Sequence, residues 1–281
     1  MNTKRGLGEF ETAHGGGKIK NLEHRLEVER RKVEALADVQ GKISLNKTPE
    51  NTVRFAVTAD RHFGSLYTNT AALRGFYEHC ARCGVKEVYD AGDILDGHKV
   101  YKGQEFELRD IGLESQIGRA AEASSGLGIK TYFITGNHDA SFKNLAGAPV
   151  GKMIEQSVSD HVFLGEEQAR VRWEVPNGKI EMMLIHPGGG TSYALSYRPQ
   201  KIVESLEGGT KPDLLVVGHY HKAEFLPSYR NVAVLQAGTF QKQTPFMARQ
   251  GLAAHVGGWI VEVFVGIGCK AIKAEFVAVY V

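Results

Sequence analysis

Short apolar runs alternate with polar, helix-like stretches from about residue 53 of this 281-residue chain. The first three runs are rich in β-branched and aromatic residues and predict strands at Val53–Thr58, Glu87–Ala91 and Thr131–Thr135. Helical spacing of apolar positions lies between them, near residues 70–83 and 104–125. Strands that alternate with helices are typical of a parallel sheet joined by crossover helices.

The pattern changes after about residue 161 to a succession of strands with few helices between them. Some of these strands are joined by hairpin-like turns such as Pro176-Asn177-Gly178. The expected strands are Val162–Leu164, Ala169–Val175, Ile180–Ile185, Leu214–Val217, Val232–Gln236, Trp259–Val265 and a last one from Lys270 to Val281. We therefore predict an α/β fold in which two packed mixed β-sheets are flanked by helices and form one domain, residues 51–281.

The first 50 residues have a different character. Residues 1–17 predict a flexible leader, and residues 18–40 predict a charged helix with one apolar stripe. This stripe suits either a partner-binding helix or a helix laid on its own domain. Gly41 and Pro49 are expected to bracket a linker. No apolar run reaches the roughly 18 residues of a membrane span, so we expect a soluble, cytoplasmic protein.

Charge and cysteine content narrow the picture only slightly. The net charge is +2. Residues 1–47 hold 10 Lys/Arg against 7 Asp/Glu, so the rest of the chain is near neutral. Charge alone therefore gives little reason to expect a nucleic-acid partner. The three cysteines suit a reducing compartment. Cys80 and Cys83, with His79 beside them, lack a second cysteine pair for zinc and are expected to be buried helix residues.

Five polar blocks, each directly after an apolar run, hold the residues with the clearest chemistry. These blocks are Asp60-Arg61-His62, Gly92-Asp93-Ile94-Leu95-Asp96, Gly136-Asn137-His138-Asp139, His186 and Gly218-His219-Tyr220-His221. Oxygen donors and imidazoles in one set suit manganese, iron or zinc better than magnesium. Because ligands bind at the carboxyl ends of strands in such folds, we expect the blocks to meet around two divalent ions. Two ions roughly 3.5–4 Å apart can clamp a phosphate.

These blocks, in this order, resemble the calcineurin-like metallophosphoesterase family over about residues 53–265. The resemblance implies that one metal is held by Asp60, His62 and His221, the other by Asn137, His186 and His219, and that Asp93 bridges both. It also implies that His138 faces the scissile phosphate, where it donates a proton or stabilises charge, with Asp139 fixing its tautomer. Asp96 is expected to orient a ligand without binding metal itself.

A narrower resemblance points to DNA. The segment Asp93–Gly97 with Val100–Glu105, and the segment Ala237–Thr244, are similar to the small exonuclease subunits of archaeal family D DNA polymerases. Those subunits usually carry an oligonucleotide-binding barrel before the phosphoesterase domain, whereas we expect a helical leader in residues 1–50 here. The resemblance implies a manganese-dependent nuclease, a 3′-to-5′ exonuclease on single-stranded DNA, with a replication or repair protein as partner.

Substrate contacts are expected from residues near these blocks. Arg61 and His98 could meet phosphates, although Arg61 could equally pair with an acid. The loop after His186 carries Tyr193, Tyr197 and Arg198, whose aromatic faces could stack on unpaired bases or simply pack the loop on the sheet. Two other functions stay open: hydrolysis of a small nucleotide ester, and a non-catalytic scaffold.

Overall fold

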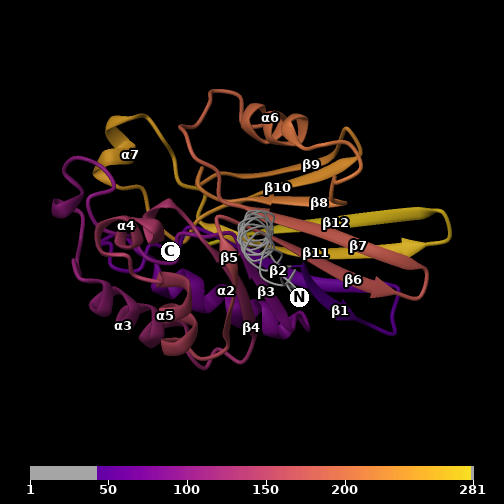
Figure 1. Ribbon diagram of the computed structural model, residues 1–281, viewed down its shortest axis with the longest axis horizontal. Coiled ribbons are helices and arrows are strands. Elements are labelled where there is room, and N and C mark those ends of the chain that lie inside the picture. The colour runs from indigo at the N-terminus through magenta and orange to yellow at the C-terminus, as the bar shows by residue number, and fades with distance from the viewer. Residues whose placement is uncertain (1–42, 280–281) are drawn as a thin grey trace, which may run out of the picture. The chain divides into compact units, whose positions relative to one another are not determined.

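The computed structural model describes residues 43–279, which form two six-stranded sheets packed face to face, with helices on their outer faces (Figure 1). The predicted leader and charged helix of residues 1–40 lie outside the described residues. None of the helices in the described part is long and apolar enough to cross a membrane.

The first sheet contains the strands expected from the front of the sequence. Its order is β12-β11-β2-β3-β4-β5, with β2 to β5 parallel and with β11 antiparallel to both β2 and β12. These strands span Thr52–Thr58 (β2), Glu87–Asp90 (β3), Lys130–Thr135 (β4), His161–Glu166 (β5), Gly257–Gly266 (β11) and Cys269–Ala278 (β12). The predicted parallel sheet is therefore confirmed.

The second sheet has the order β1-β6-β7-β8-β10-β9. Strands β7, β8 and β10 are parallel neighbours, whereas β6 and β9 run antiparallel to β7 and β10. The strands span Ile43–Lys47 (β1), Gln168–Val175 (β6), Gly178–Ile185 (β7), Leu214–Val217 (β8), Ala223–Tyr229 (β9) and Val232–Ala237 (β10). Both sheets are mixed, as predicted.

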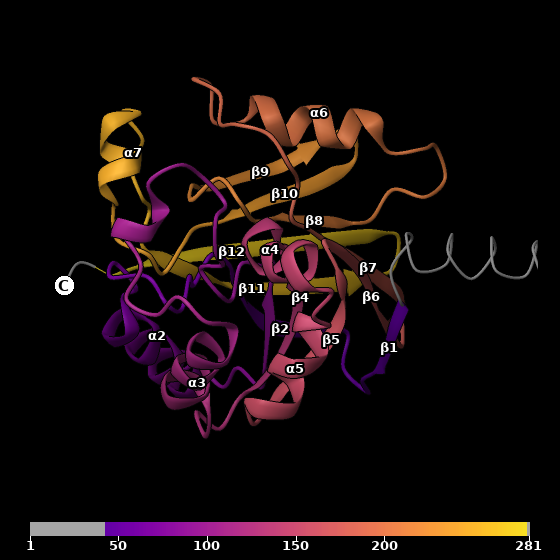
Figure 2. The same ribbon diagram turned by 60° about the vertical axis from the view of Figure 1, so that its left-hand side comes forward.

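Helices cover the outer face of each sheet (Figure 2). They are α2 (Thr70–Arg82), α3 (Leu113–Ser124), α4 (Asn137–Ala146) and α5 (Val150–Ser157) on the first sheet and α6 (Tyr197–Ser205) on the second, while the short helix α7 (Pro245–Arg249) stands away from both faces. Helix α2 packs Phe76 into a buried cluster with Val88 and Phe133 of the first sheet. Helix α6 packs Val203 against the second sheet. Each helix thus buries one apolar stripe and leaves its other side to solvent.

The main core lies between the two sheets. Phe55 of β2 stacks on Trp173 of β6, with ring centroids 5.2 Å apart and planes 11° apart. Trp259 of β11 fills the same layer and donates its indole N–H to the Gln236 carbonyl at 2.8 Å. Alternate residues of the strands point into this layer.

Three local expectations need correction. Residues 43–47, expected as a linker, form β1 and pair in parallel with β6. The helix expected over 104–125 begins only at Leu113, because the preceding chain forms a single 3-10 turn at Gln104–Phe106 and then an irregular loop. Strand β9 and helices α4, α5, α6 and α7 were not predicted; β9 contains Pro227, which lowers its strand signal.

Of the two cysteines expected to be buried on a helix, only Cys80 meets the expectation. Cys80 is buried on α2, Cys83 follows the end of that helix, and both are free, as is Cys269. No group of potential metal donors among residues 43–279 includes a cysteine.

Candidate metal centre

Most of the predicted donor residues have strained backbone conformations in the loops that follow β2, β3 and β8. Five of them have left-handed φ angles, namely Asp60 (53°), His62 (51°), Asp93 (55°), His219 (79°) and His221 (54°). Such angles cost roughly 1–3 kcal/mol each for a residue other than glycine. Strain concentrated on these residues indicates that the fold holds them for a function.

The first group of donors joins the block after β2 to the block after β8. Asp60, His62 and His221 offer ligand atoms that all lie within 4.8 Å of one another. The His62 and His221 Nε2 atoms are 3.0 Å apart, and Asp60 Oδ1 lies 3.8 and 3.4 Å from them. Two ring nitrogens and a carboxylate oxygen that face one point fit a divalent cation.

The second group lies beside the first. Asp93, His186 and His219 again offer ligand atoms within 4.8 Å of one another. The His186 Nε2 atom is 3.1 Å from Asp93 Oδ2 and 3.1 Å from the Asn137 side-chain oxygen. The structure therefore brings the seven predicted donors close together; their division between two metals, with Asp93 bridging, stays a prediction.

Hydrogen bonds select which ring nitrogen of each histidine faces the centre. His186 donates its Nδ1–H to the Ala91 carbonyl at 2.7 Å, and His219 donates its Nε2–H to the Gly189 carbonyl at 2.6 Å. The lone pair of each ring is then on the opposite nitrogen. Histidines that bind metals are commonly fixed in this way, so this pattern fits metal ligation.

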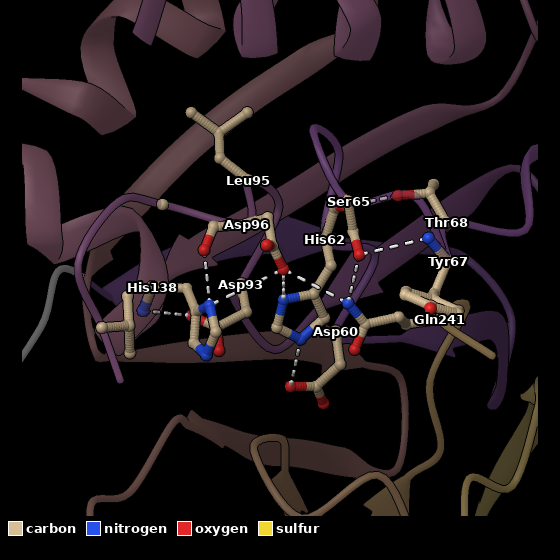
Figure 3. Close-up of polar contacts among 12 residues, drawn as sticks. Asp60, His62, Ser65, Tyr67, Thr68, Asp93, Leu95, Asp96, His138 and Gln241 are labelled. Carbon is tan, nitrogen blue, oxygen red and sulfur yellow. Dashed lines mark hydrogen bonds and ion pairs between the residues drawn. The ribbon is translucent and has the colours of Figure 1, made fainter. Parts of the chain in front are cut away.

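Asp96 contacts the ring nitrogen of His62 that points away from Asp60 (Figure 3). Its Oδ1 lies 2.9 Å from His62 Nδ1 and also accepts a hydrogen bond from Gln241 at 3.2 Å. The Gln104 side chain donates to the Asp96 carbonyl at 2.7 Å. Because His62 Nε2 faces Asp60, Asp96 contacts the opposite nitrogen of the ring. Sequence reasoning missed Gln104, although it lies in the segment whose resemblance was noted.

His138 stands at the N-terminus of α4 and lines the cavity above the donors. Its Nδ1 donates to the Asp96 carbonyl at 2.6 Å, which leaves Nε2 for a substrate. Its backbone N–H donates to Asp93 Oδ1 at 2.8 Å. Burial holds the pKa of His138 below its ordinary value despite the nearby Asp93 charge.

The role expected for Asp139 is wrong. Its carboxylate points away from the His138 ring and accepts backbone N–H groups from Leu95 at 2.8 Å and from Gly136 at 2.9 Å. The Asp96 carbonyl, not Asp139, fixes the tautomer of His138. Neighbouring residues at the start of a helix point about 100° apart, so adjacency in sequence did not mean contact. Asp139 instead fastens the loop that carries Asp93.

The charges of the neighbouring histidines keep the Asp93 carboxylate ionised despite its burial. Burial alone would raise the pKa of Asp93, but the histidines around it, His186 first among them, hold that pKa well below its usual range. Burial would lower the pKa of His186, and the Asp93 charge raises it to about 9. The negative charge of Asp93 is therefore stabilised by the histidines around it.

Two glycines leave room for the centre. A Cβ at Gly136 would lie 2.2 Å from Asp93 Oδ1, and one at Gly92 would lie 2.7 Å from His186 Nδ1. Gly92 also has a left-handed φ of 96°. Glycine at these positions lets the backbone turn tightly against the donors, as expected.

A cavity of about 440 Å³ opens over both groups of donors. Its floor holds His62, Asp93, His138, His219 and His221, and Gly189 and Gly190 form part of its rim. The remaining lining residues are Tyr101, Thr191, Tyr220, Gln241, Thr244, Phe246, Met247, Gln250 and Leu252. Those of helix α7 and the loop after it carried no recognisable signal in the sequence. A volume of this size suits one nucleotide-sized ligand.

Arg61 is not a substrate contact. Its side chain is fully buried and forms an ion pair with Asp90, with Nε 2.7 Å from Oδ2. It also donates to Tyr77 at 2.8 Å and to His161 Nε2 at 3.2 Å. Burial, with the charge of Arg61, lowers the pKa of His161 to about 3, so this ring accepts as a neutral base. Arg61 thus anchors the backbone between the donors Asp60 and His62.

Asp90→Ala is expected to lower the free energy of unfolding by about 3–5 kcal/mol, because it leaves the buried Arg61 guanidinium uncompensated. Chemical denaturation measures this change. The control is Glu174→Ala, since the Lys47–Glu174 pair lies at 3.4 Å with side chains 83% and 50% exposed; its expected effect is within about 0.5 kcal/mol. Equal losses in both variants would contradict a structural role for the buried pair.

The other predicted substrate contacts lie outside the cavity. Among the described residues that line it, none is His98, Tyr193, Tyr197 or Arg198. Tyr193 is fully exposed, and Tyr197 begins α6 with about half its surface exposed. Their roles remain predictions for a substrate longer than the cavity, while the glycines of the same loop do reach the site.

This fold and this donor arrangement define a metal-dependent hydrolase domain. The chain belongs to the calcineurin-like phosphoesterase family, whose model matches residues 53–223. The family implies divalent metal ions, and the two groups of donors, with their fixed ring tautomers, fit them.

The curated relatives are DNA polymerase II small subunits. That of Halobacterium salinarum is 25% identical over 248 residues, which cover 74% of this chain and 48% of the relative. That of Archaeoglobus fulgidus is 26% identical over 204 residues, covering 60% and 40%. The chain thus spans less than half the length of these relatives.

A solved structure shares the fold. It is described as GAP50, the anchor in the inner membrane complex of Plasmodium, and it matches with a TM-score of 0.50 at 13% identity. The match covers 81% of this chain and 84% of that one. At this identity the similarity concerns the fold alone.

Proposed function

We propose that this protein is a two-metal phosphodiesterase that hydrolyses DNA as a 3′-to-5′ exonuclease on single strands. The observation that carries the proposal is the convergence of seven oxygen and nitrogen donors in two adjacent groups, four of which, His62, Asp93, His219 and His221, line one cavity. Asp93 contributes to the second group and is predicted to bridge both.

The chemistry divides between the metals and the protein. When bound, two divalent ions supply a water molecule of lowered pKa and positive charge beside the phosphate. His138 holds Nε2 toward the cavity because its Nδ1 is committed to the Asp96 carbonyl. It donates a proton to the leaving oxygen or stabilises charge there. Asp96 and Gln241 keep His62 in place.

DNA is the favoured substrate because the relatives are DNA polymerase small subunits. The same likeness supports a replication or repair protein as partner. Manganese is proposed as the metal, with iron or zinc as alternatives, since the set mixes imidazoles with carboxylates and an amide. Three free thiols support a cytoplasmic location.

A small nucleotide ester, such as a cyclic nucleotide, is the second candidate substrate. It is favoured by the cavity volume of about 440 Å³, which fits a single nucleotide. Hydrolysis of either candidate substrate depends on the same metal donors, and only the residues at the rim of the cavity distinguish the two.

The test is digestion of single-stranded oligonucleotides, labelled at the 5′ or the 3′ end, by protein loaded with manganese. A 5′-labelled strand that shortens stepwise supports the 3′-to-5′ exonuclease. Uncut DNA together with rapid turnover of cyclic nucleotides would select the second candidate. Removal of metal by a chelator is expected to abolish either activity, and manganese is expected to restore it. Activity that survives the chelator, with no metal found by elemental analysis, contradicts both.

A further inference from the structure

One wall of the cavity is aromatic and belongs to neither group of donors. The rings of Tyr101 and Phe246 stack with centroids 4.4 Å apart and planes 27° apart. Tyr101 comes from the loop after β3, and Phe246 comes from α7, far along the chain. Both are half-buried, and both line the cavity beside His138, whose ring centroid is 6.2 Å from that of Tyr101.

A buried carboxylate holds this pair in position. Glu107 is only 4% exposed, and its Oε2 accepts the Tyr101 hydroxyl at 2.9 Å. Its Oε1 accepts the backbone N–H of Phe246 at 2.9 Å, so one side chain fixes both aromatic residues. A carboxylate is costly to bury unless its oxygens are satisfied. Glu107 therefore fixes the position of the two rings, which does not result from incidental packing.

The wall continues into a small apolar surface. Met247 and Leu252 line the cavity beside the pair, whereas the donors occupy the floor. A ligand that fills this space needs an anionic phosphate at the floor and a flat apolar group at the wall. Among phosphate esters, nucleotides carry both.

We propose that the Tyr101–Phe246 pair stacks on the nucleobase of the nucleotide whose phosphate lies over the donors. This inference rests on the proposed phosphodiesterase function and adds to it the residues that contact the base of the nucleotide ester. A base inside a duplex is covered by its neighbours on both faces, so the wall selects unpaired ends. Glu107 is a positioning residue that acts through the two rings.

The test compares two chromogenic diesters with manganese-loaded full-length protein. The p-nitrophenyl ester of thymidine 5′-monophosphate and methyl p-nitrophenyl phosphate share a charge and a leaving group and differ in the nucleoside. The kcat/KM of the thymidine ester divided by that of the methyl ester measures what the base contributes. Phe246→Ala is expected to lower this ratio at least about tenfold, on the scale of one base–aromatic stack. Glu107→Gln is expected to lower the same ratio.

The matched control is Phe264→Ala. Phe264 is 43% exposed on β11 and pairs with Thr52 at the start of β2, the end of that strand away from the donors. This variant is expected to keep the wild-type ratio. An unchanged ratio in Phe246→Ala, or an equal loss on both diesters, would overturn the stacking proposal.

Binding gives a readout that does not need turnover. Calorimetric titration with thymidine 5′-monophosphate in calcium is expected to show a Kd at least about tenfold weaker in Phe246→Ala than in the wild type. Inorganic phosphate serves as the probe without a base, and the ratio of the two Kd values carries the result. A protein inactive on both diesters would reject the proposed function. The titration would still decide on the nucleobase, because an unchanged ratio of Kd values overturns that proposal.

Discussion

Asp93→Asn is expected to lower kcat/KM for phosphodiesters at least about 100-fold and to weaken metal binding at both groups of donors. Asp93 Oδ2 lies 3.1 Å from His186 Nε2, while its Oδ1 accepts the His138 backbone N–H at 2.8 Å. An amide in its place has one oxygen and no charge, so it cannot offset two divalent ions at short range. Loss of a metal that stabilises the transition state costs several kcal/mol. Elemental analysis and steady-state kinetics measure the two effects.

Asp160→Asn is the matched control for this change. Asp160 also has a left-handed φ, 63° against 55° for Asp93, and asparagine tolerates that conformation as aspartate does. It is exposed and lies just before β5 begins, at the opposite ends of the strands from the donors. We expect wild-type activity and metal content. Full activity in Asp93→Asn would show that Asp93 does not bridge.

His138→Ala is expected to retain both metals while slowing hydrolysis by about 10²–10⁴, the usual scale of acid–base assistance. The ring lines the cavity but belongs to neither predicted ligand set, and its Nδ1 is held by the Asp96 carbonyl. Metal content should therefore stay unchanged while kcat falls. The loss should be larger for DNA, whose leaving group is an alkoxide, than for a p-nitrophenyl ester, whose leaving group needs no proton.

The leaving-group comparison separates the two roles left open for His138. Equal losses on both substrates support charge stabilisation, and a loss confined to DNA supports proton donation. His79→Ala, a histidine on α2 that contacts Cys83, controls for loss of an imidazole and is expected to be silent. Undiminished activity of His138→Ala on DNA would contradict both roles.

The strands were predictable because their chemistry is local. Runs such as Leu214–Val217 and Val232–Ala237 are buried throughout and rich in β-branched residues, so apolar pattern alone identifies them. Strand β1 was missed because it is short and carries mixed residues, and its pairing with β6 joins segments more than 120 residues apart. Pairing at that separation leaves no local signal.

The donors were predictable for a related reason. Each block follows a strand, and parallel strands place their carboxyl ends at one edge, so strand order alone predicts that Asp60, Asp93 and Asn137 meet. The directions of individual side chains were not predictable in the same way. Arg61 lies between two donors in sequence, yet it points inward to Asp90 and carries structural charge. Asp139, next to His138, points to the backbone of Leu95.

The sequence by itself determined most of the strands, the residue types that can hold metals and the family to which they belong, because these depend on periodicity and on motifs of a few residues. Only the tertiary structure decided that Glu107 joins Tyr101 to Phe246, that Asp96 sets both His62 and His138, and that Arg61 is buried. These contacts join segments that are separate in the chain. Their geometry depends on how the loops and helices pack, which no local pattern encodes.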